Sequence, residues 1–170
     1  MARWLTATAL VLTAVVLVIL PGCKSTDTST KKSGEASATG AQHVFEYSSG
    51  GASHPEGFGE WRVRLTSGGL FTVTHVLGER ATVLGTFFLT KAETDRLWQL
   101  ITDAGIGSEE SSTRAGVPDE VKHAFTLRGK DADKSVSVWA NDLDKHESLA
   151  AVRDEIKQLI KAYTGKKPVL

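Results

Sequence analysis

The strongest constraint on the fold is an alternation of apolar and polar side chains in two segments of this 170-residue chain. In residues 61–66 every second side chain is apolar, and residues 121–128 repeat the pattern with His123 as one member of the otherwise apolar set. A period of two is typical of a strand that buries one of its faces. A glycine-containing turn and a second β-prone segment follow each strand, which predicts two antiparallel hairpins.

Four further segments favour strands and two favour helices. The strand segments are residues 44–48, 70–77, 82–89 and 135–140, the third with a bend at Gly85. The first helix begins at the capping box of residues 90–93, in which a threonine hydroxyl and a glutamate carboxylate satisfy the first backbone amides. The second is the amphipathic stretch 149–163, which Gly165 terminates and which begins at a second capping box, residues 144–147, or at Ser148.

The order of these elements is four strands, a helix, two strands and a helix, joined by hairpins without a crossover between parallel strands. This order predicts an α+β fold, an antiparallel sheet of about five to six strands with two helices packed on one face. Trp61, Trp98 and Trp139 are expected to pack in the core or on the sheet. Trp139 lies opposite to the apolar set of its own strand, so it would anchor a partner if it were exposed.

Cys23 is the only cysteine of the chain and directly follows an apolar stretch. Arg3 precedes apolar residues 5–20, which is the arrangement of a secretory signal. The run Leu-Pro-Gly-Cys at residues 20–23 resembles the lipobox of bacterial lipoproteins. The resemblance implies cleavage after Gly22, acylation of Cys23 with fatty chains such as palmitate, and attachment to a membrane. The alternatives are an uncleaved anchor helix and a free or intermolecularly paired thiol.

The leader predicts the location and the division of the chain. We expect a lipoprotein signal peptide in residues 1–22, the lipidated cysteine and a disordered tether in residues 23–42, a single α+β domain in residues 43–165, and a C-terminal tail in residues 166–170. The tether segment lacks the large apolar side chains that folding requires. The protein is therefore expected to be exported and lipid-anchored to the cell membrane or outer membrane, with its domain facing the periplasm or the exterior.

Five features of the domain occur together: Ser-Gly-Gly at residues 49–51 after an aromatic strand, a hairpin, a Thr-capped helix, Gly-Val-Pro-Asp at residues 116–119 before a strand pair, and a final amphipathic helix. This combination resembles the emfourin family, protein inhibitors of thermolysin-like metalloproteases, and related uncharacterised bacterial lipoproteins. Gly50, Gly51 and Asp119 match the pattern, whereas the segment after the glycine pair is longer here and contains His and Pro. The resemblance implies a protein partner such as a protease.

Two long glycine-containing loops, residues 49–59 and 107–119, predict where a partner binds, because recognition concentrates on loops held by a rigid scaffold. The candidate binding residues are Gly50, Gly51, His54, Phe58 and Asp119. We expect a membrane-anchored exported lipoprotein that binds an envelope protein or a protease, with protease inhibition as one form of that activity. The alternative is a structural or assembly lipoprotein of the cell envelope.

No sequence pattern here supports catalysis, so we expect no enzyme, no catalytic residue, no metal and no cofactor. The motifs G-x-S-x-G and H-E-x-x-H are absent, as are paired cysteines. The formal net charge of zero argues against nucleic acid as a partner. His123 is expected to be a hydrogen-bonded core residue, the alternative being a tuned acid or base in an enzyme whose residues converge only in the fold. The acidic pairs at residues 109–110 and 119–120 are expected to be solvated.

Overall fold

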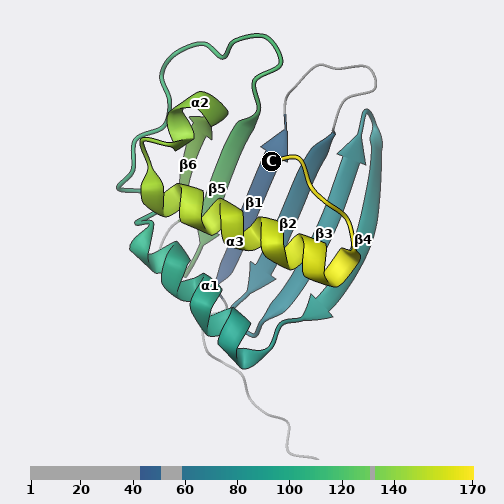
Figure 1. Ribbon diagram of the computed structural model, residues 1–170. Helices are drawn as coiled ribbons and strands as arrows, with labels where there is room; N and C mark the ends of the chain where they lie inside the picture. Colours follow the sequence, from purple (N-terminus) through teal and green to yellow (C-terminus); the bar gives the residue numbers. More distant parts are fainter. Residues whose placement is uncertain (1–42, 51–58, 131–132) are drawn as a thin grey trace, which may run out of the picture. The chain divides into compact units, whose positions relative to one another are not determined.

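The computed structural model describes residues 43–50, 59–130 and 133–170. Within them, the strands form one antiparallel sheet in the order β4-β3-β2-β1-β5-β6 (Figure 1). The strands are β1 (Val44–Gly50), β2 (Glu60–Thr66), β3 (Leu70–Leu77), β4 (Arg80–Phe88), β5 (Lys122–Arg128) and β6 (Lys134–Trp139), and the helices are α1 (Lys91–Asp103), α2 (Ala140–Leu143) and α3 (Glu147–Thr164). The predicted α+β fold is confirmed. The proposed signal segment, Cys23 and the tether lie outside the described residues.

The centre of the sheet is the pairing of β1 with β5, two strands that are far apart in the sequence. Tyr47 of β1 lies opposite Val63 of β2 on one side and Phe125 of β5 on the other. The remaining neighbours in the sheet, β2 with β3, β3 with β4 and β5 with β6, are joined by short turns. β1 therefore connects a four-stranded meander to a separate hairpin.

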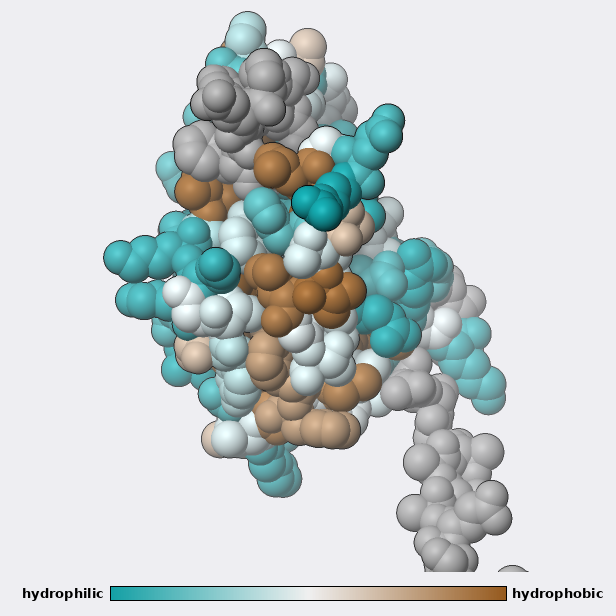
Figure 2. All heavy atoms as spheres, turned by 90° about the vertical axis from the view of Figure 1, so that its right-hand side faces the viewer, coloured by the Kyte–Doolittle hydropathy of each residue, from teal (hydrophilic) through white to brown (hydrophobic). Residues whose placement is uncertain are grey.

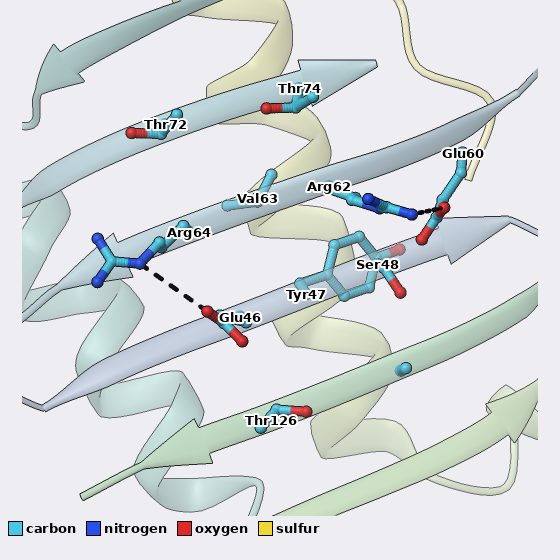
Figure 3. Close-up of a pocket in the computed structure, with 11 residues that line it drawn as sticks. Glu46, Tyr47, Ser48, Glu60, Arg62, Val63, Arg64, Thr72, Thr74 and Thr126 are labelled. Atoms are coloured by element: carbon cyan, nitrogen blue, oxygen red, sulfur yellow. Dashed lines mark hydrogen bonds and ion pairs between the residues drawn. The ribbon is translucent and has the colours of Figure 1, made fainter. Parts of the chain in front are cut away.

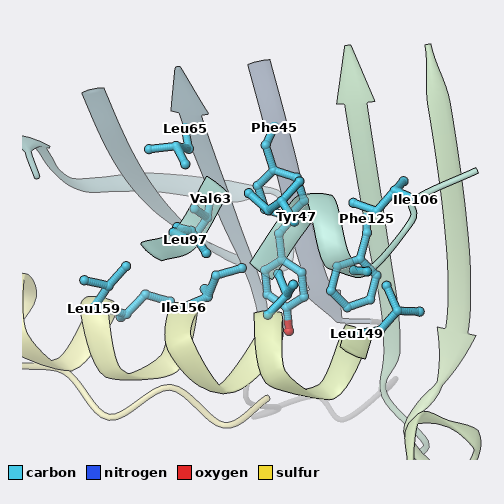
Figure 4. Close-up of a cluster of buried hydrophobic side chains, with 14 of the residues drawn as sticks. Phe45, Tyr47, Val63, Leu65, Leu97, Ile106, Phe125, Leu149, Ile156 and Leu159 are labelled. Atoms are coloured by element: carbon cyan, nitrogen blue, oxygen red, sulfur yellow. The ribbon is translucent and has the colours of Figure 1, made fainter. Parts of the chain in front are cut away.

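Helices α1 and α3 cover one face of this sheet, and α3 crosses the strands diagonally (Figure 1). The apolar half of each alternating strand points toward these helices, so that the period of two places one residue set in the core. Figure 4 shows Phe45, Tyr47 and Phe125 of the sheet facing Leu149 and Ile156 of α3. All five side chains are buried, which makes this layer the hydrophobic core of the domain.

The structure confirms the predicted start of α1 and the predicted end of α3, and it corrects the predicted start of α3. The capping box at the start of α1 is present: the Thr90 hydroxyl accepts from the Glu93 amide at 3.2 Å, and the Glu93 carboxylate accepts from the Thr90 amide at 2.8 Å. Gly165 ends α3 in the left-handed conformation with φ of 69°. The predicted capping box at residues 144–147 is wrong, because Asp144 has helical angles as the C-cap of α2 and cannot take the extended conformation of an N-cap. The alternative start at Ser148 is wrong as well, because the N-cap of α3 is His146.

Strand β4 contains the irregularity that the sequence indicates at Gly85. The register with β3 shifts between Val73 and Thr74, so that Leu84 is an extra residue without a partner on β3. A Cβ atom at Gly85 would lie 2.2 Å from the Phe87 ring, which excludes larger residues unless the ring moves. The strand is therefore bulged in its middle while both halves remain paired.

His123 is a core residue, as expected from its place in the alternating set. Its side chain is 0% exposed, and its Nδ1 lies 2.9 Å from the Tyr47 hydroxyl. Its Nε2 is buried and has no hydrogen-bond partner among the described residues. Burial, with a smaller contribution from the positive charge of Arg153, lowers the pKa of His123 to about 4. The imidazole is therefore neutral at physiological pH.

This buried imidazole predicts a loss of stability in mild acid. The folded-state pKa of about 4 lies below the ordinary value of 6.5, so the neutral form stabilises the fold fully above pH 6.5 and this contribution is lost as the pH falls toward 4. The loss amounts to about 3 kcal/mol in the free energy of unfolding. His123→Gln keeps an acceptor for Tyr47 but does not titrate, so urea unfolding between pH 7 and 4 should show a weaker pH dependence. An equal dependence in both proteins would contradict this assignment.

Candidate functional site

The second face of the sheet, which we call the open face, carries no helix in the part of the chain that the structure describes. It displays the polar half of each alternating strand. Its centre is a shallow hollow of about 470 Å³ (Figure 3). The open-face residues that line the hollow are Glu46, Ser48, Glu60, Arg62, Arg64, Thr72, Thr74, Ala124 and Thr126. Small and hydroxyl-bearing residues thus surround two acidic and two basic side chains.

The charges in the hollow are unequally paired. Arg62 donates to Glu60 at 2.6 Å, and Arg128 at the rim donates to Glu46 at 2.9 Å. Arg64 is 3.8 Å from Glu46, too far for a hydrogen bond, and its side chain is 52% exposed (Figure 3). The guanidinium of Arg64 therefore keeps donors that an incoming carboxylate or carbonyl group can use.

Replacing these ion pairs by contacts with a partner costs little. Exposed ion pairs contribute between 0 and about 1 kcal/mol, because water screens both charges. A carboxylate of a partner that binds Arg64 and Arg62 in forked geometry would offset the loss of the bond to Glu60. The open face is thus suited to reversible polar recognition.

The segment between α1 and β5 forms a rigid loop held by one arginine. Arg114 donates to both carboxylate oxygens of Glu120, at 2.8 and 2.5 Å, and through Nε to Asp142 at 2.8 Å. Glu120 also accepts from the backbone amides of Val117 and Asn141. We call these three side chains, Arg114, Glu120 and Asp142, the Arg114 cluster. Its contacts join the loop to α2.

Electrostatics in the Arg114 cluster favour the ionised carboxylates. The hydrogen bonds from Arg114, followed by those from the amides of Val117 and Asn141, lower the pKa of Glu120 to about 2 against the opposing effect of burial. Ser112 and Lys145 lower the pKa of Asp142 below its ordinary value. The expectation that Glu120 is solvated is wrong, because its side chain is buried within this cluster.

The same loop covers the outer edge of β6. The Ser112 amide donates to the carbonyl of Ser137, and the Ser111 hydroxyl accepts from the Ser137 amide. The Ser112 hydroxyl accepts from the Trp139 amide at 3.1 Å. Backbone groups that an edge strand would otherwise expose are satisfied, so this edge is closed to further strand pairing.

Trp139 fastens the loop to the open face. Its indole Nε1 donates to the carbonyl of Arg114 at 3.1 Å, and the Lys122 ammonium lies 5.4 Å from the ring centroid. A Cβ atom at Gly116 would lie 2.7 Å from the ring, so the close approach of the loop requires glycine. The tip of the loop then presents Val117, which is 53% exposed. The loop thus exposes an apolar contact point.

Of the predicted binding residues, the structure describes Gly50 and Asp119. Gly50 ends β1 opposite Lys122 of β5, where a Cβ atom would lie 2.6 Å from the Glu60 Cβ. Asp119 has φ of 63° in the turn closed by the bond from the Glu120 amide to the Val117 carbonyl. Both residues lie near the Lys122 end of the sheet. Each has a conformational role, since both positions restrict the backbone or the space around it.

The remaining predicted site residues lie outside the described residues: Gly22, Cys23, Gly51, His54 and Phe58. Sequence reasoning missed the hollow and the Arg114 cluster. The alternation in β2 already places Arg62 and Arg64 on one face, which was the available signal for the hollow. No comparable signal identified Glu120, because its partners Arg114 and Asn141 come from different segments.

Comparisons with known proteins give no relative: a scan of protein-family models and a search of curated sequences each found no match. In the described ranges no group of three or more acidic, histidine or cysteine side chains is arranged to hold a metal ion. None of the described helices is both long and apolar enough to cross a membrane.

The Arg114 cluster predicts how the loop responds to loss of one carboxylate. Glu120→Gln removes the charge that binds Arg114, so the backbone amides of Val117 and Asn141 should exchange with deuterium faster. Glu110→Gln, at an exposed position of the same loop, is the matched control and should leave exchange unchanged. In the wild type the protection should weaken as pH falls from 4.5 toward 2, because the pKa of Glu120 is lowered in the folded state. Unaltered exchange in Glu120→Gln would contradict the role of the cluster.

Proposed function

We propose that this chain is an exported, lipid-anchored protein whose folded domain binds another protein. The observation that supports the binding role most is the open face: a polar hollow of about 470 Å³ with no helix over it in the described residues. A purely structural sheet face needs neither a hollow with an arginine that keeps free donors nor a loop fixed by hydrogen bonds to one buried carboxylate. Loss of Arg114 would leave the buried carboxylate of Glu120 without its counter-charge, which indicates that the position of the loop matters.

The charges on the open face favour a partner with acceptor groups. Basic residues Arg62, Arg64, Lys122 and Arg128 outnumber the acidic residues Glu46 and Glu60 on the strands β1, β2 and β5. A segment with carboxylate side chains or exposed carbonyls fits this pattern, and Val117 adds an apolar contact at its end. The partner proposed is an envelope protein or a protease, and protease inhibition is the more specific form of the proposal.

The membrane anchor is supported by the run Leu-Pro-Gly-Cys at residues 20–23 after an apolar leader. A protein with two or more acyl chains on Cys23 remains on a bilayer, since a single chain binds only reversibly. Anchoring would hold the domain close to the proteins of the envelope and raise the effective concentration of any partner there.

Loss of the lipid attachment point should release the protein. In cells that make the full chain, Cys23→Ala is expected to move most of the protein from the membrane fraction to the soluble fraction, whereas Ser25→Ala should remain membrane-bound. Fractionation followed by immunoblotting makes the measurement. Equal membrane retention of Cys23→Ala and wild type would show that the anchor is not attached to this cysteine.

Removing the two arginines of the hollow should weaken partner capture. Arg62→Ala combined with Arg64→Ala is expected to reduce the amount of cross-linked partner by about tenfold or more, equivalent to about 1.4 kcal/mol. Lys157→Ala, exposed on α3 at the opposite face, is the matched control. Thermal unfolding should give the same midpoint for all three proteins. Undiminished capture by the double variant would exclude the open face as the binding surface.

Protease inhibition has a direct assay. Incubation of the protein with thermolysin-like proteases should reduce peptide hydrolysis, and Val117→Asp at the loop tip should relieve that inhibition. Full proteolysis at a large molar excess of the protein would leave the binding proposal standing but remove inhibition as its form.

A further inference from the structure

The two edge strands of the sheet, β6 and β4, differ in their backbone contacts. The edge at β6 is bonded to the segment around Ser111 and Ser112, whereas β4 is the last strand of the sheet on the other side. Within the described ranges no segment pairs with the outer side of β4. Figure 2 faces this edge and shows apolar and uncharged side chains running down its middle with charged residues on either side. An uncovered strand edge offers backbone amides and carbonyls to another strand.

Apart from the bulge at Leu84, β4 carries little of the usual protection of an edge strand. Val83 is 64% exposed and Phe88 is 78% exposed, and Leu77 at the turn into β4 is also exposed. No charged residue occurs between Ala81 and Phe88. Natural edge strands commonly carry lysine or proline, and large exposed apolar residues in a row are unusual outside an interface.

We propose that β4 is an interface at which two copies of this chain pair their β4 strands antiparallel and join their sheets. A two-fold axis between Leu84 and Gly85 brings Ala81 opposite Phe88, and Val83 opposite Thr86, of the second copy. All four residues lie on the open face, as their partners Val76, Leu70, Thr74 and Thr72 on β3 show. The most exposed aromatic ring therefore meets one of the smallest side chains.

The same register also pairs matching residues on the helix-covered face of β4. On the helix face, Thr82 lies opposite Phe87 of the second copy, because these residues pair with His75 and Phe71 on β3. Leu84 then faces Gly85 across the axis. Both halves of β4 keep matching faces because the extra residue Leu84 lies directly beside the two-fold axis.

Charge favours antiparallel over parallel pairing of the two copies. Arg80 is the only charged residue of β4. An antiparallel pairing leaves the two Arg80 side chains at opposite ends of the interface, about 27 Å apart at roughly 3.4 Å per residue. A parallel pairing would place them side by side and repel. An interface of two strands is small, so we expect weak association in dilute solution.

Disulfide trapping tests the interface and its register. In the full chain in detergent, with Cys23→Ser so that no other thiol is present, Val83→Cys combined with Thr86→Cys should form a disulfide-linked dimer under mild oxidation. Val83→Cys alone should give several-fold less dimer, because position 83 does not face itself across the axis. The matched control is Lys157→Cys with Lys161→Cys, two exposed sites on α3. Equal cross-linking of the control and the β4 pair would overturn the proposal.

Sedimentation equilibrium provides the second measurement. The full chain with Cys23→Ser should show a mass that rises toward twice the monomer with concentration, and Val83→Lys should weaken this association by about tenfold or more. Val117→Lys, an equally exposed valine in the loop, should have no effect. A chain that stays monomeric at its highest soluble concentration would overturn self-pairing, even if another protein were found to bind at β4.

Discussion

The pairing of β1 with β5 is the interaction on which the rest of the structure depends. It joins the meander β4-β3-β2-β1 to the hairpin β5-β6, and thereby aligns Tyr47, Val63 and Phe125 in one layer beneath α3. Without it the two groups would each present a narrow apolar face, too small to bury both helices. The same pairing places His123 beside Tyr47 and fixes the Lys122 end of the sheet, where the rigid loop returns.

The packing of both long helices on one face has consequences for the other. Helices α1 and α3 bury the apolar side-chain set, so the polar set of every strand is left on the open face. The segment between α1 and β5 then covers the β6 edge, whereas no described segment covers β4. The packing of α1 and α3 on one face therefore leaves two different surfaces. The open face can bind polar groups, whereas the β4 edge can pair with another strand.

Local signals in the sequence predicted the elements well where a short stretch of chain carries the whole cause. The capping box at Thr90, the left-handed Gly165 and the alternation around His123 each depend on neighbours within a few residues. Prediction failed where distant groups compete. Asp144 is a residue type typical of an N-cap, but it has helical angles as the C-cap of the short helix that follows β6. Glu120 looks solvated in sequence, but Arg114 and the Asn141 amide enclose it.

The sequence by itself determined the fold class, the alternating faces of β2, β5 and β6 and the resemblance of residues 20–23 to a lipobox, because periodicity and short motifs are local properties. Only the tertiary structure decided the strand order, and with it which polar side chains meet in the hollow and which edge stays uncovered. Strand order depends on β1 finding β5 across more than half of the domain. That choice follows from burying all the apolar faces at once, and no single segment encodes it.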